Sequence, residues 1–476
     1  MSEIPVAAID VGTSNVKLAV YDESLSIKDL TVVKAPLKVS SLSIRHDPDR
    51  LRIVLGSMLV KASRLGAKFV GVSVYRGSVA SWRRGGLVRG DIVLWADYLA
   101  HHKAYTMLPL RAKVLEKLPI IGNLLGPTSP LPLLLYKSQA AGAERAWTID
   151  ALVAEWLVGR YAGEPVNAGL LGVLDPIMGF MVGFHRLSGF KGEEPAIVLH
   201  DEVLGEKDGV HIGPVIADQQ SSFLASRCLI DDCVKVDMGS GFFATASFPG
   251  PGALLMSGVV PLIALKTRDS HLACIESMAP GVGIFLEEAS RLLGGFSALK
   301  NLNLEICLRF RPPPSIPYVP APRENPYLPS NIPSAAIGRG REVVACSIVA
   351  GASLALAYHI YRAGRTSDST LVRAFGGASR LNIILEIASA LTGYTIEAYP
   401  NVEAASRGAA ILALHASGYM SLREALRIRL PEPLAVFKGG KPSLRLLQAW
   451  EDLVRGRFSV LSELLEEYWE IVGSIM

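Results

Sequence analysis

One short pattern occurs twice in the chain, once near the N-terminus and once near the middle. Residues 7–22 are AAIDVGTSNVKLAVYD, and residues 234–247 are VKVDMGSGFFATAS. In both segments an apolar run precedes Asp-x-Gly-[Ser/Thr] and a second apolar run follows, which predicts a strand, a tight turn and another strand. The repeat predicts two related domains that face one another, each contributing one hairpin.

The turn of each hairpin carries small residues that favour a phosphate ligand. In residues 12–14 and in residues 239–241, glycine with Ser or Thr lets backbone N–H groups approach a phosphate closely. Asp10 stands at a strand end, where its carboxylate can hold a hydrated metal ion. A phosphate chain is therefore predicted to lie between the two turns.

Length and composition fit two large domains. The 476 residues exceed the typical size of one domain and half of them are apolar, so two full cores are expected. The longest apolar run, residues 346–357, is shorter than the roughly 20 residues that span a bilayer, and it predicts a buried helix. The N-terminus lacks the pattern of a signal peptide. We expect a cytoplasmic protein without a membrane segment.

The net charge and the cysteines point to no special partner. The net charge of +4 comes without a basic block, so no nucleic-acid partner is expected, while an anionic small molecule is compatible with it. The cysteines have no CxxC spacing, and no His lies at metal-ligand spacing from them. We expect reduced, mostly buried thiols rather than a metal site at Cys228, Cys233, Cys274, Cys307 and Cys346.

A predicted helix and strand place polar residues at the edge of the first sheet. Residues 47–66 carry apolar side chains at helical spacing, and residues 68–75 are a buried strand. That strand delivers Tyr75, Arg76 and Gly77 to its C-terminal end. Ligands of open α/β sheets usually bind there.

Several other positions in the first half have alternative interpretations. Trp95 can cover a sugar ring and Asp97 can accept hydroxyl hydrogen bonds, but core packing and helix capping fit them equally. Asp218 lies between a predicted strand and helix, where a general base would be placed, although its spacing alone favours a helix N-cap. Asn167, within the loop-like residues 163–176, is predicted to be a turn residue.

The second half is predicted to continue after its hairpin with two helices and, later, a strand that ends in a glycine turn. Residues 284–293 and 342–362 are predicted helices, separated by a Pro-rich connection over residues 312–333. Gly376 and Gly377 then follow a strand and leave room for a flat ring or a phosphate before the next helix, with Ser379 as its cap.

The C-terminal part is interpreted as structural. Residues 403–419 form an Ala-rich helix whose small side chains allow close packing. Ser421 and Glu424 predict a capping box for another helix, and at least two further amphipathic helices follow. The tail is too short for another binding domain.

Together these segments resemble the FGGY carbohydrate kinases, whose ATP-binding fold is shared by actin, hexokinase and the heat-shock chaperone ATPases. The resemblance runs from residue 9 to about residue 419, with the motifs in the expected order. It implies an α/β fold of two ribonuclease H-like (actin-like ATPase) domains facing each other across a cleft, at residues 1–229 and 230–476. The matching motifs are Asp10-Val-Gly-Thr-Ser-Asn-Val-Lys17, Trp95-Ala-Asp97, Asp218-Gln-Gln220, Gly239-Ser-Gly241, Gly376-Gly-Ala-Ser379 with Asn382, and Gly408-Ala-Ala410.

The resemblance also implies roles for these residues. Asp218 matches the catalytic base of the family, and Asp10 would orient Mg²⁺ through water. The residues expected at ATP are Asp10, Gly12, Thr13, Ser14, Asn15, Lys17, Gly239, Ser240, Gly241, Gly376, Gly377, Ser379 and Asn382. The residues expected at the substrate are Tyr75, Arg76, Gly77, Trp95, Asp97, Asp218 and Gln219.

The chain departs from the family where the substrate is chosen. Glycerol kinases carry a carboxylate after the arginine that matches Arg76, and here Gly77 replaces it. The His of xylulokinases is also absent, while Tyr75 is similar to an aromatic residue of deoxy-ketose kinases. Lys17 stands where the family often has Arg.

The predicted function is ATP-dependent phosphorylation of a sugar or polyol hydroxyl, with a ketose such as xylulose or ribulose ahead of glycerol. The alternative from another class is a non-catalytic nucleotide-binding or sugar-binding protein that kept the fold, but a sensor needs neither Asp10 nor Asp218. A chaperone-like ATPase would need a peptide-binding module after residue 420. The expected partners are a small sugar or polyol and, in a homodimer, a second copy of the chain.

Overall fold

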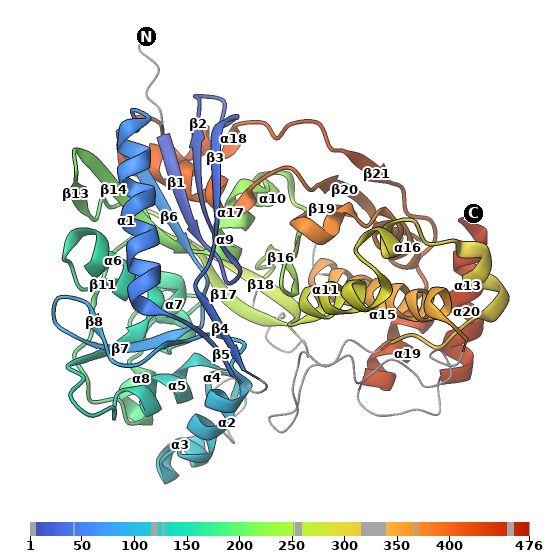
Figure 1. The fold of residues 1–476 in the computed structure, drawn as a ribbon, viewed down its shortest axis with the longest axis horizontal. Coiled ribbons are helices and arrows are strands. Elements are labelled where there is room, and N and C mark those ends of the chain that lie inside the picture. Colours follow the sequence, from blue (N-terminus) through green and yellow to red (C-terminus); the bar gives the residue numbers. More distant parts are fainter. Residues whose placement is uncertain are drawn as a thin grey trace.

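The computed structural model describes residues 6–40, 43–115, 122–125, 129–250, 252, 259–315, 339–365, 369–454 and 461–475. Three large sheets dominate them: two sheets of six strands in the first half of the sequence and one of seven strands in the second half. The six-stranded sheet that contains the N-terminal hairpin is called the first sheet below, and the seven-stranded sheet the second sheet. In Figure 1 the blue and green elements of the first half lie mainly on the left, and α11, α13, α15 and α16 of the second half lie on the right.

The first sheet is built around the N-terminal hairpin. Its strand order is β13-β14-β6-β1-β2-β3, in which β1, β2 and β3 are antiparallel neighbours and β6 and β14 run parallel to β1. Its strands are β1 (Val6–Val11), β2 (Asn15–Tyr21), β3 (Ile27–Lys34), β6 (Phe69–Val74), β13 (Gly205–Lys207) and β14 (Val210–Ala217).

Both faces of this sheet are covered, because β1 is apolar at every position but Asp10. Ala7, Ile9 and Val11 belong to the core that includes α1 (Pro48–Arg64). Val6 and Ala8 point the other way, into a core shared with α17 (Ala404–Ala416). The side-chain alternation of one strand therefore faces two helices that lie more than 300 residues apart in the sequence.

The second sheet repeats this arrangement. Its order is β17-β18-β16-β15-β19-β20-β21; β16 is antiparallel to β15 and to β18, while β19 and β20 run parallel to β15. The two related domains predicted from the repeated hairpin are confirmed. The strands are β15 (Val234–Met238), β16 (Phe242–Ser247), β17 (Val260–Lys266), β18 (His271–Ala279), β19 (Leu371–Phe375), β20 (Thr395–Tyr399) and β21 (Ala435–Phe437).

The other strands of the first half form a further sheet of six strands, in the order β10-β7-β9-β5-β4 with β8 paired to β7, and a two-stranded sheet of β11 and β12. The remaining strands are β4 (Leu37–Ser40), β5 (Ser43–His46), β7 (Val79–Arg83), β8 (Leu87–Val88), β9 (Ile92–Val93), β10 (Arg145–Thr148), β11 (Ala162–Gly163) and β12 (Ala196–Ile197). The helices of the first half are α2 (Tyr98–Thr106), α3 (Leu110–Leu115), α4 (Gly122–Leu125), α5 (Pro130–Lys137), α6 (Ile149–Val158), α7 (Pro165–Leu170), α8 (Phe184–Ser188), α9 (Asp218–Ala225) and α10 (Cys228–Asp231). Those of the second half are α11 (Val282–Leu293), α12 (Ser297–Lys300), α13 (Leu304–Phe310), α15 (Arg341–Gly364), η2 (Gly377–Arg380), α16 (Asn382–Thr392), α18 (Leu422–Arg427), α19 (Leu444–Val454) and α20 (Leu461–Ser474).

The long helix α15 is a core element. Of the helices in the described ranges, it alone is long and apolar enough to cross a membrane by length and composition, and 83% of its most apolar window is buried inside the protein. Core helices of soluble proteins meet the same criterion. The predicted buried helix at residues 346–357 is confirmed.

Two local predictions are wrong. Residues 165–170 are helical rather than loop-like, because Pro165 occupies the first helical position and the Glu164 carboxylate accepts from the N–H groups of the first turn. Ser379 does not cap α16: its hydroxyl donates to the Gly376 carbonyl inside η2, and Leu381 precedes the helix. Most of the predicted Pro-rich connection lies outside the described residues.

The prediction of reduced thiols is wrong for four of the five cysteines. Cys228 and Cys233 form a disulfide, as do Cys307 and Cys346, whereas Cys274 is free and buried. Packing of α13 against α15 brings the second pair within a Cα–Cα distance of 5.4 Å, although 39 residues separate them in sequence. Sequence spacing carried no sign of this approach.

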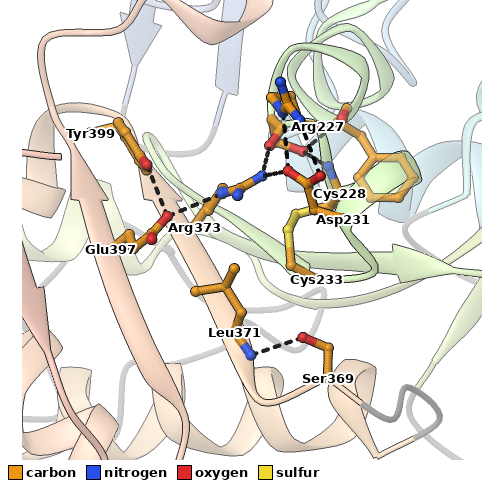
Figure 2. Close-up of a disulfide and its surroundings, with 11 residues drawn as sticks. Arg227, Cys228, Asp231, Cys233, Ser369, Leu371, Arg373, Glu397 and Tyr399 are labelled. Carbon is orange, nitrogen blue, oxygen red and sulfur yellow. Dashed lines mark hydrogen bonds and ion pairs between the residues drawn. A yellow bond between two sulfur atoms is a disulfide. The ribbon is translucent and has the colours of Figure 1, made fainter. Parts of the chain in front are cut away.

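The chain passes from the first sheet to the second through a short segment held by the other disulfide and by a polar network (Figure 2). Arg373 of β19 donates to Asp231 at 2.7 Å, to the Ser226 carbonyl at 2.9 Å and to Glu397 of β20 at 3.1 Å. Burial raises the pKa of Asp231, but its arginine partners lower it by more. The segment is thereby tied to two strands of the second sheet.

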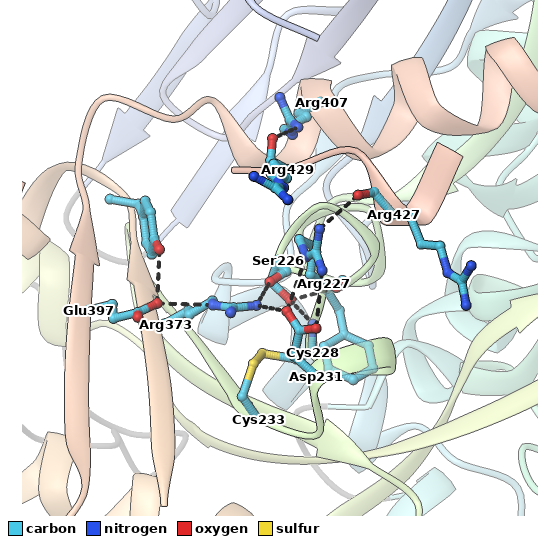
Figure 3. A network of polar contacts seen from close by, with 12 residues as sticks. Ser226, Arg227, Cys228, Asp231, Cys233, Arg373, Glu397, Arg407, Arg427 and Arg429 are labelled. Carbon is cyan, nitrogen blue, oxygen red and sulfur yellow. Dashed lines mark hydrogen bonds and ion pairs between the residues drawn. A yellow bond between two sulfur atoms is a disulfide. The ribbon is translucent and has the colours of Figure 1, made fainter. Parts of the chain in front are cut away.

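The same segment also contacts the C-terminal helices (Figure 3). Arg227 pairs with Asp231 and donates to the Arg427 carbonyl at the end of α18. Nearby, Arg407 of α17 donates to the Arg429 carbonyl. α17 and α18 thus return to pack on the first sheet, although a division at residue 229 would assign them to the second domain. That division stays a prediction.

Candidate active site

A cavity of about 870 Å³ lies between the two halves, and both hairpin turns reach it. Most of the residues predicted for ATP and substrate line it, namely Asp10, Gly12, Thr13, Ser14, Asn15, Lys17, Arg76, Gly77, Trp95, Asp218, Gln219, Gly239, Ser240, Gly376 and Gly377. Its described lining does not include Tyr75, Asp97, Gly241, Ser379 or Asn382.

The first hairpin places a carboxylate and an amine side by side. Asp10 and Lys17 are register partners in β1 and β2, and the Ser73 hydroxyl donates to Asp10 Oδ1 at 2.8 Å. Lys17 Nζ lies 2.5 Å from Glu403, just before α17. Burial raises the pKa of Asp10 despite the opposing charge of Lys17. Burial lowers the pKa of Lys17, but Asp10 and Glu403 raise it by more, so the amine stays charged.

Behind the first turn lies a buried chain of hydrogen bonds. The Tyr75 hydroxyl is 2.9 Å from His46 Nδ1, and His46 Nε2 is 2.8 Å from the Thr13 carbonyl oxygen. Because a carbonyl can only accept, Nε2 carries the proton and Nδ1 accepts from tyrosine. Burial lowers the pKa of His46 to about 4, so the ring is neutral at pH 7. Tyr75 therefore supports the turn from behind, outside the described lining.

The second hairpin is held by a buried lysine. Lys235 Nζ lies 3.0 Å from Asp237 and donates to Gln219 Oε1 at 2.8 Å, so it joins β15 to α9. α11 also approaches the turn closely: a Cβ on Gly283 would stand 1.6 Å from the Gly239 carbonyl oxygen. Only glycine can occupy that position without moving the turn.

Asp218 stands at the end of β14 as the first residue of α9. The N-cap is Ala217, which makes no side-chain cap, so Asp218 is not the N-cap that its spacing favours. Its carboxylate lines the cavity and accepts from the Gln219 N–H at 2.8 Å. Burial raises the pKa of Asp218 to about 7, with further raising by Asp10 and Asp237 and lowering by Arg76. A carboxyl with this pKa can accept a proton near neutral pH.

The remaining predicted substrate residues lie in different settings. Trp95 reaches the first turn, where its Nε1 donates to Thr13 Oγ1 at 3.1 Å, and its ring lies edge-on to Phe243 of the second sheet. Asp97 is buried as the N-cap of α2 and also accepts from Ser43 and Arg45, so it occupies the capping role.

Arg76 and the apolar walls complete the site. Arg76 forms an ion pair with Glu276 of β18, across the cleft. The Gly77 N–H donates to the Asn167 side chain at 3.2 Å, so Asn167 is a structural amide in α7 rather than a turn residue. Further lining side chains are apolar: Leu124, Pro130, Val166, Leu170 and Ile263.

Sequence reasoning missed polar side chains that hold the predicted site residues in place. His46, Lys235, Glu276 and Glu403 contact Thr13, Gln219, Arg76 and Lys17, respectively. Only Lys235 had a local sequence signal: it lies inside an apolar strand, and a buried lysine needs a partner for its charge. The others are ordinary polar residues whose partners become neighbours only in the folded chain.

The comparisons with known proteins agree with this geometry. No family model matches the chain. It is 24% identical to an uncharacterized sugar kinase of Archaeoglobus fulgidus over 57% of this chain, a match that spans 63% of that protein's length.

Solved structures are similar over nearly the whole chain. A glycerol kinase of Plasmodium falciparum with ADP has a TM-score of 0.74 at 18% identity, covering 95% of this chain and 98% of that one. A ligand-bound xylulose kinase of Lactobacillus acidophilus has a TM-score of 0.72 at 14% identity, covering 98% and 99%. The chain therefore has the fold of these kinase structures, and the predicted architecture of two domains that face each other across a cleft is confirmed.

Proposed function

We propose that this protein transfers the γ-phosphoryl group of ATP to a hydroxyl of a small sugar or polyol. The supporting observation is the position of Asp218, a carboxylate with a pKa of about 7 in a cavity lined by both hairpin turns. The similarity to sugar and glycerol kinases favours the same reaction class.

In this proposal Asp218 accepts the proton of the acceptor hydroxyl as its oxygen attacks the γ-phosphorus in line. Such a base contributes about 100- to 10,000-fold to the rate. Backbone N–H groups of the two turns and Lys17 hold the phosphates, so positioning and charge neutralisation supply most of the acceleration. Closure of the two halves over the substrates would exclude water as a competing acceptor.

The charges of the cavity fit a Mg²⁺ ion. Asp10, Asp218 and Asp237 line it, and each of the other two carboxylates raises the pKa of Asp218, so a divalent cation would relieve their repulsion. The described residues contain no group of three metal-ligating side chains, so Asp10 would hold the ion together with water and phosphate oxygens. The ion would supply neutralisation of the charge that develops on the phosphates.

For the acceptor we propose a ketose such as xylulose or ribulose, with glycerol as the alternative. Gly77 removes a carboxylate that glycerol kinases carry beside the matching arginine. A ring or longer carbon chain also fits the apolar walls at Leu124, Val166 and Ile263 better than a three-carbon polyol does.

The test is ADP release with ATP and Mg²⁺ over glycerol, erythritol, xylulose, ribulose, rhamnulose and fuculose. Asp218→Ala should abolish turnover with the best acceptor while ATP binding, measured by calorimetry, stays nearly unchanged. Equal loss of binding and turnover would mean that Asp218 is structural. If no acceptor in the panel gives ADP release while ATP still binds, the non-catalytic alternative would be favoured.

A further inference from the structure

Arg76 lines the cavity and is among the residues predicted to bind the acceptor, but it already forms an ion pair with Glu276. It follows β6 of the first sheet, whereas its partner Glu276 belongs to β18 of the second. The side chain of Arg76 is 11% exposed and that of Glu276 is fully buried. The pair therefore crosses the cleft in a water-poor environment, where a charge without a partner is costly.

Other contacts keep this pair in place. Arg76 donates to Gln220 Oε1 at 3.4 Å and lies over the Phe243 ring at 5.6 Å. On the other side, the Thr245 hydroxyl donates to Glu276 Oε2 at 3.4 Å. Burial lowers the pKa of Arg76, but Glu276 raises it by more, so the guanidinium stays charged. Arg76 thus reaches the cavity as the cationic half of a neutral pair.

No other described lining cation is available for an anionic acceptor. Lys17 is paired with Glu403, and the fully buried Lys235 is paired with Asp237 behind the second turn. The cavity also contains the carboxylates of Asp10 and Asp218. An acceptor with a negative charge would approach these groups and the phosphates of ATP without a cationic side chain of its own to pair with.

We propose that Glu276 determines the charge of the acceptor: by neutralising Arg76 from the opposite half of the cleft, it makes the site select neutral sugars and polyols and reject sugar acids. This inference rests on the proposed function and specifies its substrate class. Glu276 does not line the cavity, so it acts through Arg76 as a positioning residue. Without its charge, the guanidinium could form a bidentate pair with a substrate carboxylate.

The experiment compares kcat/KM for neutral acceptors (xylulose, ribulose, glycerol) with that for acids (gluconate, glycerate). Wild-type enzyme should prefer the best neutral acceptor over either acid by about 100-fold or more, as expected for an uncompensated charge in a partly desolvated site. Glu276→Gln should reduce this preference by about 10-fold or more, mainly through a lower KM for the acid.

Glu155→Gln is the matched control. Glu155 pairs with Arg145 at 2.8 Å outside the cavity, with side-chain exposures of 13% for Arg145 and 3% for Glu155, and Arg145 also lies over an aromatic ring. Its substitution should leave the ratio of acid to neutral turnover unchanged. Glu276→Asp, which keeps the charge, should retain the wild-type preference and covers the case in which the glutamine variant does not fold.

The inference is overturned if wild-type enzyme uses an acid as well as a neutral acceptor, or if Glu276→Gln changes the ratio no more than Glu155→Gln does. Either result leaves the proposed function standing, because turnover is still observed. Absence of turnover with every neutral and acidic acceptor would instead overturn the proposed function, and this inference with it.

Discussion

The two hairpins have the same Asp-x-Gly-[Ser/Thr] sequence but are supported in different ways. The first is held by side chains around its turn: Lys17 pairs with Glu403, and His46 holds the Thr13 carbonyl. The second is held by the buried Lys235 and by the backbone approach of α11 at Gly283. The repeat therefore encodes a common backbone shape, while each half of the molecule supplies its own supports.

The largest difference in unfolding free energy is expected between variants of the two hairpin lysines, Lys235 and Lys17. Lys235→Met leaves Asp237 without its buried partner, and breaking such a pair costs about 3–5 kcal/mol. Lys17→Met breaks a pair that is 25% exposed on both sides and should cost about 1 kcal/mol. Urea unfolding of both variants measures the two costs. Equal losses of unfolding free energy would contradict the distinction between the hairpins.

A methyl group at Gly283 should disturb the second hairpin alone. Gly283→Ala places a Cβ against the Gly239 carbonyl and should lower stability by about 2–3 kcal/mol, with a raised KM for ATP. Gly56→Ala in α1 is the control, because its Cβ meets nothing within 4 Å. The control should be neutral or slightly stabilising, since alanine favours helices. A Gly283→Ala variant as stable as this control would show that the turn can move freely.

The first hairpin should respond to loss of one hydroxyl. Tyr75→Phe removes the donor to His46 Nδ1 and leaves a buried acceptor without its partner, at a cost of about 1–2 kcal/mol. We expect a lower melting temperature and a moderately raised KM for ATP, with KM for the acceptor unchanged. A change confined to the acceptor KM would instead place Tyr75 at the substrate.

The smallest expected effects are shifts in the pH dependence of kcat/KM, caused by the two hairpin carboxylates acting on the pKa of Asp218. Since Asp218 must be ionised to accept a proton, kcat/KM should rise with pH, with a midpoint close to 7. Asp237→Asn should lower this midpoint, and Asp10→Asn should lower it further, because the charge of Asp10 raises the pKa of Asp218 more. An unchanged midpoint in both variants would mean that the carboxylates of Asp10 and Asp237 do not affect the pKa of Asp218.

The same pKa has a consequence for stability. The pKa of Asp218 is raised from 3.8 to about 7 in the folded chain, so the folded state binds its proton more tightly than the unfolded state. Stability contributed by this group is present below pH 4 and is lost as pH rises to 7. Asp218→Asn should therefore exceed wild type in melting temperature at pH 8 but not at pH 4.

Much of the fold was predictable because its information is local. The apolar run of β1, the Asp-Pro start of α1 and the capping box of α18 each follow from residues within one element. The order of motifs likewise predicted the two facing domains, and most of the site residues that it predicted line the cavity.

What the sequence by itself determined is the pair of hairpins, the strand-to-helix position of Asp218 and the two facing domains, since these depend on periodicity and on short motifs. Only the tertiary structure decided which acidic side chains pair with the cations of the site. Arg76 and Glu276 are 200 residues apart, and Lys17 and Glu403 are 386 apart. Both pairs form only when distant segments meet in the folded chain: β18 of the second sheet brings Glu276 to Arg76, and α17, packed on the first sheet, brings Glu403 to Lys17. No local pattern in the chain encodes either contact.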